Sequence, residues 1–95
     1  MVAITRPRFD LGRVVATPGS LGVFAASSQV PHDFLYRHVR GDWGDLCPAD
    51  CQENEFSLEH QLRLLSSYRD RHGTKFWIIT EADRSATTVL LPEEY

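Results

Sequence analysis

The sequence lacks any apolar run long enough to cross a membrane. A transmembrane helix needs about 20 consecutive apolar residues, and no stretch of these 95 residues approaches that length. Residues 1–8 also lack the apolar segment of a secretory signal peptide. We therefore expect a cytoplasmic protein with no membrane partner, in which residues 1–8 are a flexible lead-in to a single domain.

Cysteine is scarce as well. The two cysteines, Cys47 and Cys51, are four residues apart, which on a helix aligns their side chains poorly for a disulfide bond. A structural zinc site needs four ligands, and no second close pair is present. We expect reduced thiols, no metal and no other cofactor. A reactive thiolate at Cys47, just before a predicted helix, is the less favoured alternative to a half-buried thiol.

Positive charge is missing from the middle of the chain. Residues 41–62 contain six carboxylates and no Lys or Arg, whereas residues 1–40 contain five arginines against two aspartates. One interpretation is a solvated helix face whose acids pair with arginines elsewhere in the fold; the other is an acidic surface for a basic protein partner. A sequence pI near 5.7 and the lack of a nucleic-acid-binding motif argue against direct nucleic-acid binding.

The remaining patterns predict one α+β domain. Thr17 suits a helix N-cap and Pro18 the first helical position. Gly41 suits the end of a second helix and Pro48 the start of a third. Residues 70–73, ending in glycine, are typical of a hairpin loop. The predicted order is a strand over 9–17, helices over 18–27, from 31 to about 40 and 48–60, then strands over 62–69, 75–80 and 87–91.

The strand over residues 75–80 has apolar side chains on both faces, with Phe76 and Ile78 on one and Trp77 and Ile79 on the other. Both faces of such a strand must be covered. We predict a three-strand antiparallel meander after the N-terminal strand, in an antiparallel sheet with the helices packed on one face. The cover of the second face is a helix, the surroundings of the N-terminal strand or, in a homodimer, another subunit.

Two short motifs lie outside the core pattern. Trp43 stands between two glycines and is either a lid over the core or an anchor for a partner. The Asp83–Arg84 turn is either a structural loop, with the carboxylate capping its own backbone, or a recognition element. A small hydrolase using Asp42, Asp45, Glu81 and Asp83 is a third hypothesis, but no histidine is spaced as an obvious partner for them. We expect no enzymatic activity.

The motifs GDWGDL at residues 41–46, LLSSY at 64–68, IITEADRS at 78–85 and LLPEEY at 90–95 resemble a family of small bacterial proteins carried on plasmids, integrative elements and genomic islands, some of which are labelled restriction-modification subunits. The resemblance covers about residues 9–95 and implies a mobile-element setting, in which small accessory proteins block CRISPR complexes or restriction enzymes. The chain departs from the family at Cys47 and Cys51 and in the glycine-poor segment 56–61.

Charge pattern and resemblance together predict a non-enzymatic protein-interaction module, foremost an inhibitor of a host defence complex of the anti-CRISPR type. The alternative is a partner of the element's own transfer or replication proteins. The predicted partner-binding residues are Asp42, Trp43, Asp45, Asp50, Glu53, Glu55, Glu81, Asp83 and Arg84.

Overall fold

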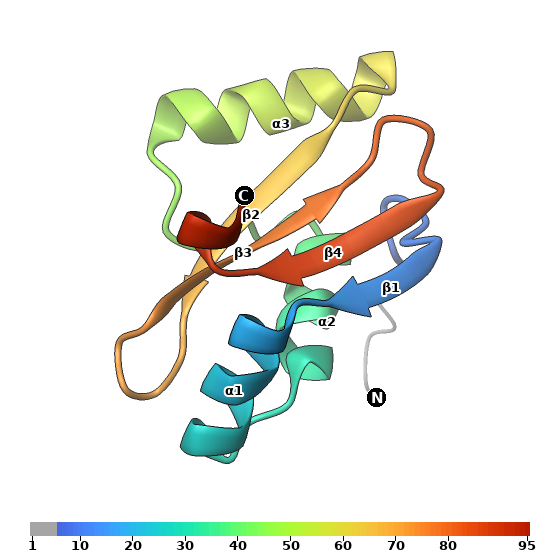
Figure 1. Cartoon of the computed structure of the whole chain (residues 1–95). Helices are drawn as coiled ribbons and strands as arrows, with labels where there is room; N and C mark the ends of the chain where they lie inside the picture. The colour runs from blue at the N-terminus through green and yellow to red at the C-terminus, as the bar shows by residue number, and fades with distance from the viewer. Residues whose placement is uncertain (1–5) are drawn as a thin grey trace, which may run out of the picture.

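A computed structural model describes residues 6–95 and has the predicted α+β architecture (Figure 1). Three α-helices and one four-stranded sheet follow the predicted element order. Among residues 6–95, none of the helices has the length and apolarity that a bilayer crossing requires. The elements are β1 Arg13–Ala16, α1 Pro18–Ser27, α2 Pro31–Val39, α3 Pro48–His60, β2 Leu64–Arg69, β3 Lys75–Thr80, β4 Ala86–Leu90 and the short 3-10 helix η1 Pro92–Glu94.

The helices begin at the residues that the sequence predicts. Each has proline at its first turn, and the hydroxyl of Thr17 accepts a hydrogen bond from the Ser20 amide as the N-cap of α1. Gly41, which follows α2, has a φ of 82°, a left-handed conformation that glycine adopts without strain. α3 ends at His60, as predicted.

The sheet is mixed, which corrects the predicted antiparallel sheet. Strands β2, β3 and β4 form the expected antiparallel meander, but β1 lies at the far edge and runs parallel to β4, in the order β1-β4-β3-β2. β1 is also shorter than the predicted strand over 9–17, because Gly12 has a φ of 64° and interrupts the extended backbone. Three helices separate β1 from the meander in the sequence, so local pattern does not specify its direction.

The core lies between one face of the sheet and the first two helices. Phe24 of α1 and Phe34 of α2 pack against Phe76, Ile78 and neighbouring side chains of the sheet. The remaining members of this cluster are Tyr68 and Val89. In Figure 1 α2 lies behind the sheet, α1 lies below it and α3 runs along the β2 side.

The opposite face of β3 is largely covered by the chain itself. Ile79 is only 5% exposed, and the ring of Trp77 meets that of the C-terminal Tyr95 edge to face. The predicted separation of Phe76 and Ile78 from Trp77 and Ile79 is confirmed by the strand register. Ile79 therefore does not require a second subunit to be buried, although a homodimer stays a prediction.

The outer edge of β2 is closed by hydrogen bonds from outside the sheet. The side-chain amide of Asn54 in α3 donates to the Leu65 carbonyl and accepts from the Leu65 amide. Two residues along, the Ser67 amide donates to the carbonyl of Trp43 and the Ser67 carbonyl accepts from the amide of Asp45. Gly44 lies between these partners with a φ of 75°, and a side chain there would collide with the Ser67 carbonyl.

The sequence predicts a flexible segment over residues 1–8, of which residues 1–5 lie outside the described residues. At its end, the Arg8 amide donates to the Val39 carbonyl at 2.7 Å and its guanidinium binds Glu55. The N-terminal segment is thereby attached to both α2 and α3.

Candidate interaction surface

Trp43 is a lid over the core rather than an exposed side chain. Its side chain is 5% exposed and its ring stacks on that of Phe9. The ring of His38 meets the Trp43 ring edge to face, with 5.8 Å between the ring centroids. Trp43 Nε1 donates to Glu55 Oε2 at 3.0 Å, and that carboxylate also holds the Arg8 guanidinium. The hydrogen bonds from Arg8, and secondarily from Trp43, lower the pKa of Glu55. Trp43 and Glu55 thus join the N-terminal segment to α3.

Asp42 and Asp45 are paired with arginines of neighbouring elements. Asp42 accepts a hydrogen bond from Arg37 Nε at 2.7 Å, which is the main reason that its pKa is lowered. Asp45 lies 3.6 Å from Arg69 Nε of β2. These two acids and Glu55 are therefore neutralised by arginines from elsewhere in the fold, as the first interpretation of the acidic block predicts.

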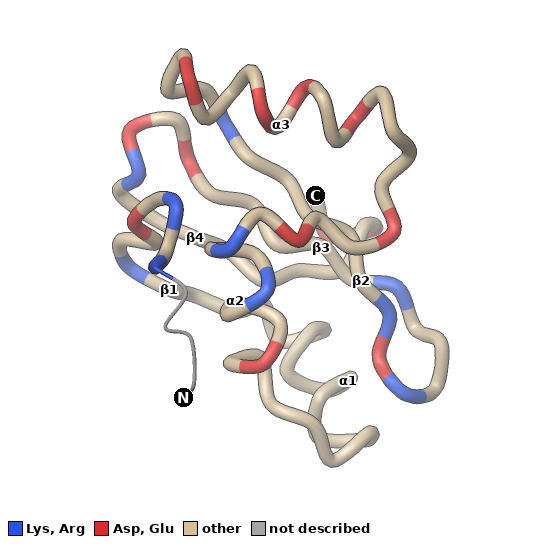
Figure 2. Tube along the Cα trace, turned by 180° about the vertical axis from the view of Figure 1, so that it is seen from behind, with Lys and Arg blue, Asp and Glu red and all other residues tan. Residues whose placement is uncertain are grey.

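The other acids of the block lie on the exposed face of α3. Asp50, Glu53 and Glu59 are exposed, and within residues 6–95 no Lys or Arg forms an ion pair with them. Figure 2 shows the acidic positions spaced along α3, which carries no basic Lys or Arg position. Three exposed carboxylates on this helix are therefore not neutralised by Lys or Arg, although Glu59 lies 4.0 Å from His60 Nε2.

An aromatic side chain stands among these carboxylates. Phe56 is 50% exposed and packs on the ring of His60, one turn later, with 4.1 Å between ring centroids. Glu53 and Glu59 lie three residues before and after it, so they border it on the helix surface. The residues three and four positions away on both sides, Gln52, Glu53, Glu59 and His60, are polar, and this is the signal in the sequence that Phe56 faces solvent.

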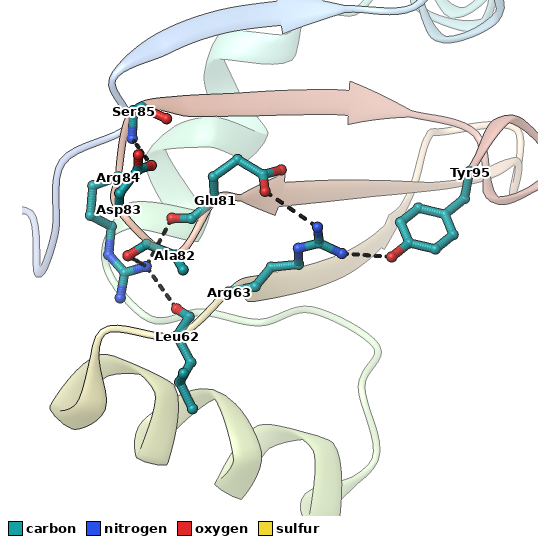
Figure 3. A network of polar contacts seen from close by, with 8 residues as sticks. All are labelled: Leu62, Arg63, Glu81, Ala82, Asp83, Arg84, Ser85 and Tyr95. Atoms are coloured by element: carbon teal, nitrogen blue, oxygen red, sulfur yellow. Dashed lines mark hydrogen bonds and ion pairs between the residues drawn. The ribbon is translucent and has the colours of Figure 1, made fainter.

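Arg84 has a structural role in the loop between β3 and β4. This residue has a φ of 62°, and its guanidinium donates to the carbonyls of Leu62, Glu81 and Ala82 (Figure 3). It also donates to the carbonyl of Ser57 in α3. The Asp83 carboxylate accepts from the Ser85 amide, and hydrogen bonding first from the Ser85 side chain and then from this amide lowers the pKa of Asp83. The loop therefore matches the structural interpretation, with Arg84 attaching it to the end of α3.

Glu81 belongs to a second small network on the sheet face that carries Tyr95. Arg63 lies between them, donating to Glu81 at 3.3 Å and to the Tyr95 hydroxyl at 2.6 Å (Figure 3). The register places Glu81 next to the Leu64 end of β2, whereas Asp45 bonds to Ser67 and faces Arg69 at the other end. The four carboxylates of the hydrolase hypothesis thus do not converge into one site.

A buried polar chain that sequence analysis did not find crosses the core. His38 of α2 is fully buried, with Nδ1 hydrogen-bonded to Ser66 and Nε2 2.9 Å from Thr80 Oγ1. Thr80 bonds to Thr87, whose hydroxyl donates to the Leu11 carbonyl. Burial, reinforced by the charge of Arg84, lowers the pKa of His38 to about 3. The Ser66–His38 pair is enclosed by the fold, so it has the role of a structural link between α2 and the sheet.

Both cysteines are free thiols. Cys47 is exposed and Cys51 half-buried, and the pKa of Cys51 is raised, chiefly by desolvation and then by the neighbouring Cys47. Within the described part of the chain, no group of three His, Cys, Asp or Glu side chains is placed to hold a metal ion.

A groove of about 760 Å³ lies between α2 and the β1 region. Its lining is largely apolar and includes Phe9, Val14, Leu35 and Tyr36. It contains none of the predicted partner-binding residues except Arg84.

The chain matches no family model, no curated protein and no solved structure. Its function must therefore be argued from the surfaces described above.

Proposed function

We propose that this chain is a non-enzymatic protein-interaction module that binds a basic protein surface through the exposed face of α3. That face consists of Asp50, Glu53, Phe56 and Glu59, and we call it the acidic face. The observation that carries the proposal is the half-exposed aromatic ring of Phe56 between carboxylates that form no ion pair with a Lys or Arg among residues 6–95; the one ion contact of Glu59 is with the neighbouring His60, at 4.0 Å.

This arrangement supports binding for two physical reasons. An aromatic ring supplies a large contact area at low conformational cost, which is why aromatic residues are frequent at the centres of interfaces. Carboxylates around it accelerate association with a positively charged partner and exclude negatively charged ones. Acids that are already paired with arginines, as Asp42 and Glu55 are, have little charge left for this purpose.

The acidic face narrows the predicted binding residues to a smaller set. Trp43, Glu55 and Arg84 hold the fold together by the contacts described above, so of the predicted residues we retain Asp50 and Glu53. We add Glu59 and Phe56, which sequence analysis did not include among the binding residues. The partner class remains the one that the family resemblance implies. We propose a host defence complex with a basic nucleic-acid groove, and an acidic helix would occupy the place of phosphate groups there.

Charge reversal at the two exposed acids that border Phe56 tests the proposal. The double variant Glu53→Lys/Glu59→Lys should reduce the association rate with a purified CRISPR effector or restriction complex by about tenfold at low salt. Phe56→Ala should weaken affinity by about tenfold, mainly through faster dissociation. Stopped-flow or biosensor kinetics measure both effects, and circular dichroism verifies that the variants fold.

A matched control uses the same charge change away from the acidic face. Asp10→Lys/Asp33→Lys alters two exposed acids that make no ion pair within the described residues, and it should leave the kinetics within about twofold of wild type. If both double variants lowered the association rate equally, the effect would be due to the net charge of the protein and not to the acidic face. Binding that none of the variants alters would exclude the acidic face. Binding only to transfer or replication proteins would retain the surface and change the partner class.

A further inference from the structure

The two edges of the sheet differ in whether their outward backbone groups have hydrogen-bond partners. The outer edge of β2 is closed by Asn54 and by the backbone around Gly44. The outer edge of β1 has no strand partner within residues 6–95. An open edge is a row of backbone donors and acceptors that another strand can extend, and natural proteins usually protect it.

The free groups on β1 can be assigned from its bonds to β4. The amides of Arg13 and Thr17 donate inward, to Ser85 and Val89. Because backbone groups alternate along a strand, the N–H and C=O groups of Val14 and Ala16 point away from the sheet. These outward N–H and C=O groups can form hydrogen bonds with the backbone of another extended strand.

The side chains of β1 add apolar area to this edge. Val14 is 45% exposed and Val15 42% exposed, on opposite faces of the strand. Val14 also lines the apolar groove against α2. Both valines would lose exposed surface if a further strand paired here.

We propose that β1 pairs antiparallel with β1 of a second copy, about a two-fold axis at Val15. In this register Val14 and Ala16 exchange backbone hydrogen bonds with Ala16 and Val14 of the second copy, because these residues have their free groups on the outer side. The two sheets become one continuous sheet. The interface is isologous, as expected of a closed dimer.

Charge complementarity favours a second copy of this chain as the occupant. The same register places Arg13 directly opposite Thr17 of the second copy, with both side chains on the same face. Within one copy, Thr17 Oγ1 donates to a carboxylate oxygen of Glu94. The exposed Arg13 guanidinium, which forms no ion pair within the described residues, thus lies beside the Glu94 carboxylate of the other copy. The two-fold axis repeats this contact.

Pairing through β1 leaves the acidic face of α3 accessible. α3 lies beside β2 at the opposite edge of the sheet, so a dimer would present two acidic faces at its far ends. The inference does not depend on the proposed function, because it involves different residues and is measured without the partner.

The oligomeric state of the full chain over a wide concentration range is the direct test. Sedimentation equilibrium from micromolar to millimolar protein should show a transition from monomer to dimer. Ala16→Pro removes an outward N–H group, and the fixed φ of proline is compatible with an edge strand. This variant should therefore remain a monomer over the whole concentration range. Arg13→Glu should raise the dimer dissociation constant about tenfold by placing two like charges opposite Glu94.

The control is Arg71→Glu, the same charge change at an exposed residue in the loop between β2 and β3, and its dissociation constant should equal that of wild type. Amide exchange gives a second measurement that needs no variant: exchange at Val14 and Ala16 should slow as wild-type concentration rises, whereas that at Val15 should not change. A wild-type monomer at millimolar concentration, or a dimer with unchanged exchange at Val14 and Ala16, would overturn the proposal.

Discussion

His38 illustrates how the small core accommodates a polar side chain. It is fully buried, but both ring nitrogens have hydroxyl partners, Ser66 and Thr80. A buried polar group with partners avoids the cost of an unsatisfied donor or acceptor. A proton added to this ring would create a charge with no carboxylate partner in the described core, beside the cation of Arg84.

The lowered pKa of His38 predicts a loss of stability in mild acid. Because the folded pKa, about 3, lies below the ordinary 6.5, the unfolded chain binds the proton more tightly. The stabilisation is complete above pH 6.5 and decreases as pH falls toward 3. Between pH 7.5 and 5.5 the free energy of unfolding should decrease by about 1.4 kcal/mol, measured by urea denaturation.

His38→Gln should remove most of this pH dependence, whatever its effect on stability at pH 7.5. Measurements above pH 5.5 avoid the carboxylates whose lowered pKa values, as at Asp42 and Glu55, also contribute in stronger acid. An unchanged slope in His38→Gln would assign the effect to another group.

At the level of elements, α3 is attached to the sheet by polar contacts rather than by a broad apolar stripe. Its buried residues are Asn54 and Ser57. Asn54 makes two hydrogen bonds to Leu65, and the Ser57 carbonyl accepts one from Arg84. Phe56 is consequently left on the solvent side. The helix that carries the acidic face therefore owes its position to the edge of β2.

Asn54→Ala should reduce the free energy of unfolding by about 2 kcal/mol, because the amide and carbonyl of Leu65 both lose their partner. Amide exchange at Leu65 should also accelerate relative to Ser67, whose bonds come from Trp43 and Asp45. The exposed neighbour Gln52 provides the control, and Gln52→Ala should leave both measurements unchanged. Stability equal to wild type in Asn54→Ala would show that α3 is held by other contacts.

At the scale of the whole molecule, the sheet has two central strands and two edges with different protection. β3 and β4 are hydrogen-bonded on both sides, β2 is closed by the α3 region, and β1 is open within residues 6–95. Recognition surfaces are thus proposed at opposite ends of the sheet. Local stability should follow the same gradient, because amides in the interior open only with the global unfolding.

Amide hydrogen exchange at low protein concentration should therefore be slowest for Phe76–Ile79 of β3 and for the interior of β4. Exchange should be fastest among the strands at the outward amides of Val14 and Ala16. Nuclear magnetic resonance resolves these positions one by one. Fast exchange across residues 76–79 would contradict the central position of β3.

Local sequence determined where the helices begin and which side chains share a face of β3. Proline at each helix start, glycine after α2 and alternation along β2 and β3 act over a few residues, so their effect can be seen without the fold. Trp43 as a core lid was one of two alternatives in the sequence. Its bond to Glu55, twelve residues later, decided between them.

The tertiary structure alone decided three features that depend on distant parts of the chain. β1 is parallel to β4 because the chain crosses over through the helices before returning to the sheet. Acids of the block separated into paired ones, such as Asp42, and free ones, such as Glu53, according to which arginines the fold brings near them. Finally, Phe56 faces solvent because Asn54 and Ser57, not the apolar residue between them, contact the sheet and its loop.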